Sequence, residues 1–166
     1  GSLRGGAGVH FVSTRGQAPA ASIESAIAAG LAPDGGLYVP ASVPLLEISA
    51  FDGCESLADV ATRLLAPFFA GDALAPELAA LRRAPFAFPV PLHRIAAPTW
   101  LPELFHGPTA AFKDYGARFL AACLARLRAD ADRELTILVA TSGDTGAAVA
   151  AAFHRRPGLR VVVLYP

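Results

Sequence analysis

The spacing of hydrophobic residues changes about halfway along the chain. In the first half the clearest pattern follows Ser56, where apolar residues recur every three or four positions: Leu57, Val60, Ala61, Leu64, Leu65 and Phe68. This spacing predicts an amphipathic helix with one buried face. The other predicted elements are short. They are a strand over 10–14, a helix over 23–29 between a Ser22 cap and Gly30, and a helix over 76–83.

The second half alternates between patterns typical of strands and of helices. The predicted elements are a strand over 99–105, a helix over 109–129, a strand over 134–141, a helix after residue 142 and a strand over 159–165. The last two strands are nearly continuous runs of apolar, mostly β-branched residues, a composition typical of strands buried on both faces. Strand and helix alternating in this way predict a parallel sheet with right-handed crossovers, and hence an α/β fold. The proline-rich segment 84–95 is expected to be a connection with short edge-type extended pieces.

We expect two domains, an N-terminal domain over 1–90 and the first part of a parallel-sheet domain over 91–166. The sequence stops directly after a strand that would normally lie inside an α/β unit, which predicts an incomplete sheet. The apolar edge of that last strand would then be free to pair with another chain, so self-association is expected.

Composition excludes several classes of function. Fourteen acidic and fourteen basic residues cancel, and no basic stripe indicates a nucleic-acid or anionic-membrane surface. Hydrophobic residues make up 54% of the chain, yet no apolar run is long enough to predict a transmembrane helix, and no secretory signal is evident. Two cysteines form no metal-binding or disulfide pattern. These features favour a cytoplasmic protein without a metal site.

The use of basic residues singles out one position. Lys113 is the only lysine, and the other thirteen basic residues are arginine. With Thr109 as the predicted helix cap, Lys113 lies in or just past the first helical turn, where the helix dipole disfavours a cation. Apolar residues at 110–112 also favour the neutral amine, which can act as nucleophile and base where a guanidinium cannot. The alternative is a solvated lysine whose charge is balanced by Asp114.

A glycine-containing loop joins a predicted strand to the next helix. It consists of Ser142, Gly143, Asp144, Thr145 and Gly146. Backbone N–H groups at such a loop face the carboxyl end of the strands, where α/β folds bind ligands, and the hydroxyls add donors for a carboxylate or phosphate. The loop matches neither the Walker A nor the dinucleotide motif. The alternative is a tight turn that caps the helix and binds nothing.

Three segments together resemble one known family. "STRGQAPAASIESAIAAGLAPDGGLYVP", "FHGPTAAFKDYGARFL" and "VATSGDTGAA" resemble threonine synthase in both order and spacing. The resemblance extends from about Phe11 to Pro166. It implies a pyridoxal-phosphate enzyme of the tryptophan-synthase-β-like architecture, fold type II.

The resemblance also implies roles for individual residues. Lys113 matches the lysine that forms the Schiff base with pyridoxal phosphate, and Phe112 matches its neighbour in the cofactor site. His106 either lines the cofactor pocket or merely satisfies a turn. Residues 142–146 match the loop that holds the substrate carboxylate. The family is a carbon–oxygen lyase that converts O-phospho-L-homoserine and water to L-threonine and phosphate, with the lysine as proton shuttle.

The sequence departs from the family in length. Members are far longer than 166 residues, and the groups that hold the cofactor phosphate and the pyridine nitrogen lie beyond the matching region. The resemblance therefore implies weak cofactor binding and little turnover by this chain alone. Two alternatives stay open. One is a related phospholyase or another fold-type-II lyase, and the other is a non-catalytic truncated paralogue.

Overall fold

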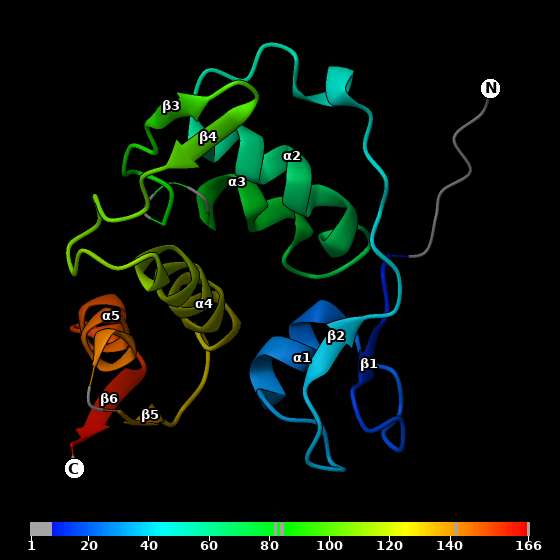
Figure 1. Cartoon of the computed structure of the whole chain (residues 1–166). Helices are drawn as coiled ribbons and strands as arrows, with labels where there is room; N and C mark the ends of the chain where they lie inside the picture. Colours follow the sequence, from blue (N-terminus) through cyan, green and yellow to red (C-terminus); the bar gives the residue numbers. More distant parts are fainter. Residues whose placement is uncertain (1–7, 82, 84, 142, 166) are drawn as a thin grey trace. The chain divides into compact units, whose positions relative to one another are not determined.

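The computed structural model describes residues 8–81, 83, 85–141 and 143–165. The chain forms two compact units, one ending at Ala80 and the other beginning at Leu81 (Figure 1). This division comes earlier than the expected one after residue 90. The physical reason is that Phe86 packs against the rings of Tyr115 and Phe119, with ring centroids 6.5 and 5.8 Å apart, so this part of the proline-rich segment belongs to the second unit.

The first unit contains the short elements that the sequence predicts. Strand β1 (Phe11–Ser13) pairs antiparallel with β2 (Tyr38–Pro40). Helix α1 (Ile23–Ala29) lies between them in sequence, and its first turn is capped by Ser22, whose side chain accepts from the N–H of Ser25. The remaining elements are η1 (Ile48–Phe51), α2 (Leu57–Phe69), η2 (Ala75–Glu77) and α3 (Leu78–Leu81).

The start of α2 confirms the prediction made from periodicity. Ser56 and Asp59 form a capping box, in which each side chain accepts from the backbone N–H of the other. Ala61 and Phe69 are buried, whereas Leu64, which was predicted to lie on the buried face, is exposed. Local sequence signals therefore define the helix but not every residue of its buried face.

A turn that precedes β2 is organised by the carboxylate of Asp34. It accepts hydrogen bonds from the Ser13 hydroxyl at 2.6 Å, the Gly36 N–H at 2.9 Å and the Gln17 N–H at 3.0 Å. The hydrogen bond from Ser13 lowers the pKa of the Asp34 carboxyl; partial burial opposes this effect and the backbone donors add to it. Arg15 donates to the Asp34 carbonyl at 2.9 Å.

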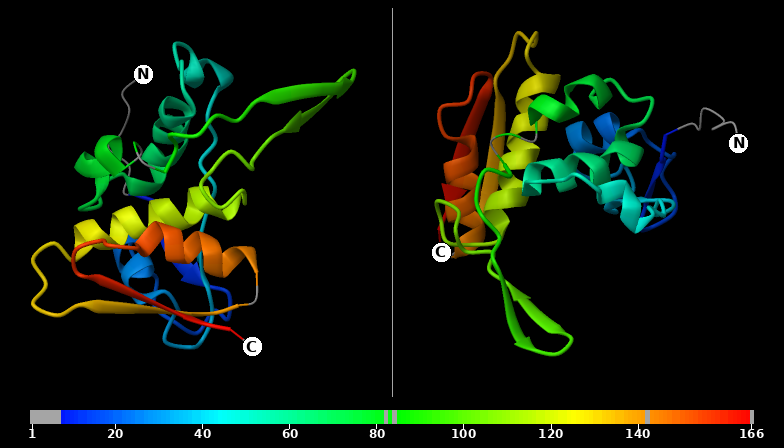
Figure 2. Two further views of the ribbon diagram at one scale, coloured as in Figure 1. Left: turned by 90° about the vertical axis from the view of Figure 1, so that its left-hand side faces the viewer. Right: turned by 90° about the horizontal axis from the view of Figure 1, so that it is seen from above.

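The second unit begins with a hairpin that the sequence does not predict. Strand β3 (Leu92–Ala96) pairs antiparallel with β4 (Thr99–Pro102), and the pair extends away from α4 (Figure 2). The prediction that residues 99–105 start the parallel sheet is therefore wrong. Only two residues join β3 and β4, and so short a connection allows only antiparallel pairing.

The rest of the unit alternates helix and strand as predicted. Its elements are α4 (Lys113–Leu127), β5 (Leu135–Ala140), α5 (Asp144–Phe153) and β6 (Leu159–Leu164). Strands β5 and β6 are parallel and in register from Leu135↔Leu159 to Ala140↔Leu164. Helix α5 packs on the sheet and α4 packs on α5. The buried core contains Ala121, Cys123, Leu124, Ala148, Ala152, Phe153 and Leu159.

One face of this sheet is open in the described part of the chain. Half-buried and exposed residues alternate along β5, and Leu138 is 64% exposed. The prediction that both strands are buried on two faces is therefore wrong for these residues, because the helices cover one face. None of the helices in the described residues is long and apolar enough to cross a membrane.

Candidate functional site

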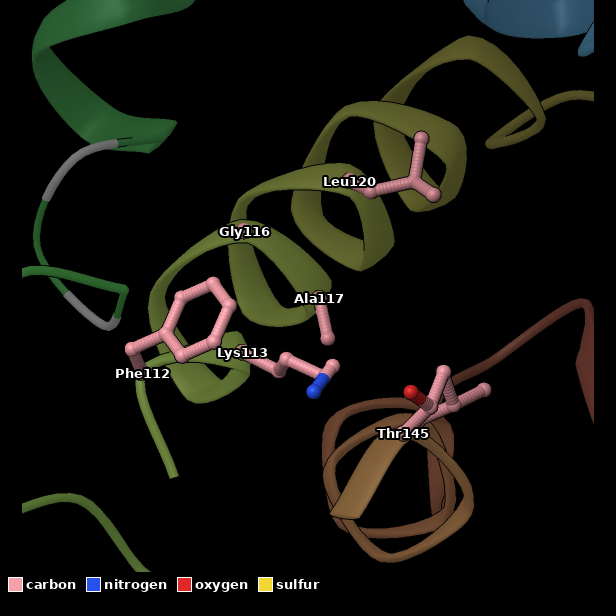
Figure 3. Close-up of a pocket in the computed structure, with 7 residues that line it drawn as sticks. Phe112, Lys113, Gly116, Ala117, Leu120 and Thr145 are labelled. Carbon is pink, nitrogen blue, oxygen red and sulfur yellow. The ribbon is translucent and has the colours of Figure 1, made fainter. Parts of the chain in front are cut away.

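Lys113 is the first residue of α4, which confirms that it lies in the first helical turn. Its side chain is 35% exposed, and Nζ lies 3.9 Å from Oδ2 of Asp144 and 4.8 Å from the ring centroid of Phe112. Figure 3 shows the amine pointing from α4 toward Thr145 on α5. The carboxylate that forms an ion pair with the amine thus comes from α5.

The Lys113 side chain lines a pocket of about 320 Å³. The residues around this pocket are Phe112, Lys113, Gly116, Ala117, Leu120, Thr145 and Val149 (Figure 3). Among these side chains only the Lys113 amine and the Thr145 hydroxyl are able to form hydrogen bonds. The pocket therefore suits a flat apolar group with a polar substituent near the amine.

Four of the residues that line the pocket were not predicted from the sequence. Gly116, Ala117 and Leu120 follow Lys113 by three, four and seven positions, which places them on the same helix face. Helical spacing from Lys113 was the signal that could have identified them. Val149 lies on α5, and no local signal connects it with α4.

The turn before α4 differs from the predicted cap. Thr109 donates its backbone N–H at 2.9 Å and its hydroxyl at 2.7 Å to the carboxylate of Asp114. The helix therefore begins at Lys113 instead of Thr109, because Thr109 acts as a donor to a side chain further along the chain. Asp114 is fully buried. The alternative in which Asp114 balances the charge of Lys113 is therefore wrong. The oxygens of Asp114 accept from Thr109, and the ion pair of Lys113 is with Asp144.

The glycine-containing loop leads into α5. Ser142 lies outside the described residues. Gly143 is the cap residue and makes no side-chain cap, and its N–H donates to the Thr141 hydroxyl at 3.3 Å. Thr145 lines the Lys113 pocket, and Asp144 forms the ion pair with the Lys113 amine.

Gly146 is buried for a packing reason. A Cβ atom on it would lie 2.4 Å from Cγ2 of Thr141 and 3.3 Å from Cγ1 of Val163. Only glycine lets α5 approach the strands this closely. The substrate-binding role of residues 142–146 stays a prediction.

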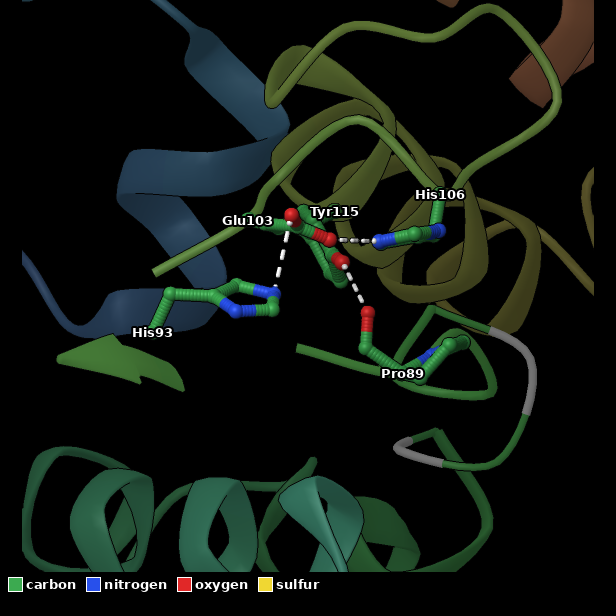
Figure 4. Close-up of polar contacts among 5 residues, drawn as sticks. All are labelled: Pro89, His93, Glu103, His106 and Tyr115. Carbon is green, nitrogen blue, oxygen red and sulfur yellow. Dashed lines mark hydrogen bonds and ion pairs between the residues drawn. The ribbon is translucent and has the colours of Figure 1, made fainter. Parts of the chain in front are cut away.

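The side chain of His106 contacts Glu103. Its Nε2 is 2.7 Å from Oε2 of Glu103, whose Oε1 is 3.0 Å from Nε2 of His93 (Figure 4). His106 is not among the residues that line the pocket, so its assignment to the cofactor stays a prediction. Phe112 does line it. Among the described residues, no group of three His, Cys, Asp or Glu side chains is placed to hold a metal ion.

Tyr115, shown in the same view, holds the proline-rich segment. Its hydroxyl donates to the Pro89 carbonyl at 3.4 Å (Figure 4). Burial raises the pKa of the Tyr115 phenol, and the nearby charge of Asp114 adds to the effect. The phenol therefore keeps its proton at neutral pH, as this hydrogen bond requires.

Comparison with known proteins shows which family the chain resembles. The family described as "Threonine synthase N terminus" matches residues 10–85. Threonine synthase from Escherichia coli is 43% identical over 148 residues, which cover 87% of this chain and 34% of that protein. Threonine synthase from Pseudomonas aeruginosa is 38% identical over 166 residues, covering 95% of this chain and 35% of the relative.

Solved structures agree with the sequence comparison. The crystal structure of PLP-bound threonine synthase from Brucella melitensis matches with a TM-score of 0.85 and 39% identity, over 95% of this chain and 36% of that one. Yeast threonine synthase matches with a TM-score of 0.80 and 30% identity, over 97% of this chain and 36% of that one. The chain thus spans about a third of the length of the curated relatives it matches. In sequence and in fold, it is similar to part of threonine synthase.

Proposed function

We propose that this chain forms the part of a pyridoxal-phosphate-dependent threonine synthase that carries the cofactor-binding lysine. The whole protein would convert O-phospho-L-homoserine and water to L-threonine and phosphate. The observation that carries the proposal is Lys113, the only lysine, at an apolar pocket beside the start of α5. The relatives of the chain are threonine synthases, and one of the matching structures is that of a PLP-bound threonine synthase.

The residues at the pocket fit this cofactor. An amine can bind an aldehyde covalently, and apolar walls pack well against an aromatic ring. Lys113 would supply the amine, while Phe112, Leu120 and Val149 supply apolar walls. When bound, the cofactor withdraws electrons from the substrate and so stabilises negative charge on its carbon atoms.

The chain itself contributes proton transfer and anion binding. The Lys113 amine would take up and return a proton, with the carboxylate of Asp144 3.9 Å away. The Thr145 hydroxyl and backbone N–H groups at the start of α5 would be donors for the substrate carboxylate. An arginine at position 113 could perform neither task of the lysine.

We place the groups that hold the cofactor phosphate and the pyridine nitrogen in the part of the family that this chain does not match. The fold-type-II sheet would be completed there as well. For the 166 residues alone we therefore expect weak cofactor binding and little turnover. We further propose a reducing cytoplasmic setting, because Cys54 and Cys123 form no disulfide in the described part of the chain.

Borohydride reduction of the chain with pyridoxal phosphate, followed by peptide mapping, tests the assignment of Lys113. The label is expected on Lys113 and is lost in Lys113→Arg, which keeps the positive charge. Label confined to the N-terminal amine in both proteins would refute the proposal. For the whole protein, release of phosphate from O-phosphohomoserine with formation of threonine is the expected activity. Release from another phosphorylated amino acid would indicate a related phospholyase, and no lyase activity a non-catalytic paralogue.

A further inference from the structure

The residue after Lys113 is a buried carboxylate with an unusual set of contacts. Consecutive helical residues project roughly 100° apart, so Asp114 does not share the direction of Lys113. Its side chain is fully buried, and its oxygens accept from the N–H and the hydroxyl of Thr109 at 2.9 and 2.7 Å. A buried carboxylate is costly unless hydrogen bonds satisfy it. Asp114 therefore ties the chain before the helix to the first helical turn.

The backbone of this turn is shaped to fit the carboxylate. A Cβ on Gly107 would lie 2.4 Å from Oδ2 of Asp114, so the side chain packs directly against that glycine. Ala110 has a φ of 54°, in the left-handed region that is unfavourable for alanine. A strained residue persists only where its surroundings hold it in place. Ala110 lies between Thr109 and Asp114 in sequence, and the two hydrogen bonds that join these residues hold it.

Lys113 depends on this arrangement because it is the first residue of α4. The first N–H groups of a helix have no partner within the helix, so this end is the least constrained part of it. We propose that Asp114 is a positioning residue for Lys113, and that its hydrogen bonds to Thr109 hold the helix start so that the amine faces the pocket. The proposal rests on the proposed function only in taking Lys113 as the cofactor lysine.

The single lysine makes the test specific. Growth with ¹³C-lysine labels one side chain of the chain, so its Cε–H signal reports on Lys113 alone. Thr109→Val keeps the β-branched shape and removes the hydroxyl donor, whereas Thr109→Ser keeps the hydroxyl. In Thr109→Val we expect the signal to move to the position of a free lysine and labelling by pyridoxal phosphate to slow about tenfold. Thr109→Ser is expected to match the wild type in both measurements, and Asp114→Asn to change them as Thr109→Val does.

A purely structural role would give a different pattern. In that case Thr109→Val would lower thermal stability while the Lys113 signal and labelling rate stayed unchanged, and the proposal would fail. It would also fail if Thr109→Ser behaved like Thr109→Val. In the wild type, hydrogen exchange supplies a measurement that needs no variant: a Thr109 N–H that exchanges as fast as an unstructured amide would overturn the proposal. If the Lys113 signal changes as expected but pyridoxal phosphate labels neither the wild type nor any variant, the positioning role stands and the proposed function fails.

Discussion

Lys113 Nζ lies 3.9 Å from Oδ2 of Asp144, and each residue is the first of its helix. The amine and the carboxylate are 35% and 70% exposed. An ion pair this exposed contributes at most about 1 kcal/mol to stability. Its importance lies in the position of the amine, because the contact connects the first residue of α4 with the first residue of α5.

Asp144→Asn is therefore expected to change the reactivity of Lys113. Loss of the ion pair removes a contact that orients the amine, so pyridoxal phosphate should label Lys113 about two to three times more slowly. Asp132→Asn, in an exposed loop, makes the same change in net charge and serves as the control. Equal rates for the two variants, measured by mass spectrometry, would show that Asp144 does not act on the amine.

Gly116→Ala should separate stability from function. A Cβ at Gly116 meets no atom within 4 Å, and alanine favours a helix over glycine by about 0.5–1 kcal/mol. The added methyl group would nevertheless occupy space in the pocket that Gly116 lines. We expect a higher urea midpoint together with slower labelling of Lys113 by pyridoxal phosphate. Labelling at the wild-type rate would indicate that the cofactor does not enter this pocket.

Gly146→Ala is expected to destabilise the protein by about 1–3 kcal/mol, because the new Cβ would overlap Cγ2 of Thr141 at 2.4 Å. Thr141→Ser removes that methyl group and keeps the hydroxyl that accepts from Gly143. The double variant should recover most of the loss, which urea denaturation of all four proteins can measure. Simple addition of the two single effects would mean that this contact is not the cause.

Asp34 predicts a dependence of stability on acid. The pKa of its carboxyl is lowered in the folded protein from the ordinary value of 3.8. The unfolded chain therefore takes up the proton first as pH falls, and the stabilisation is complete above the unfolded pKa and is lost as pH falls through the lower folded one.

We expect Asp34→Asn to be less stable than the wild type at pH 7, with the difference shrinking below about pH 3.8. Thermal unfolding at several pH values measures this difference. Glu55→Gln, at an exposed position, controls for the loss of one carboxylate. A difference between wild type and Asp34→Asn that does not change with pH would count against the role of Asp34.

Self-association is expected through the β5–β6 sheet. In the described part of the chain each of these strands pairs only with the other, and Leu138 and Leu164 are 64% and 49% exposed. The sedimentation coefficient should therefore rise with protein concentration, and Leu138→Lys should reduce the rise. Leu45→Lys changes a residue that is 99% exposed in the first unit and is the control. A monomer at all concentrations would contradict this prediction.

Some features could be predicted from the sequence because their causes are local. The capping box at Ser56, the Ser22 cap of α1 and the position of Lys113 in a first helical turn depend on residues within one or two turns of each other. The parallel pairing of β5 with β6 followed from two apolar runs separated by one helix. The family resemblance rested on motifs of the same short range.

Other features depend on residues that are distant in sequence. No local pattern shows that one face of β5 is open, or that Asp144 instead of Asp114 meets the lysine. Even the start of α4 was misplaced, because the donors of Thr109 are directed to a carboxylate five residues away. By itself, the sequence determined where the single lysine lies and which helix presents it. Only the tertiary structure decided what surrounds that amine. The pocket forms where α4 packs against α5, and this packing determines which side chains form ion pairs and hydrogen bonds with one another.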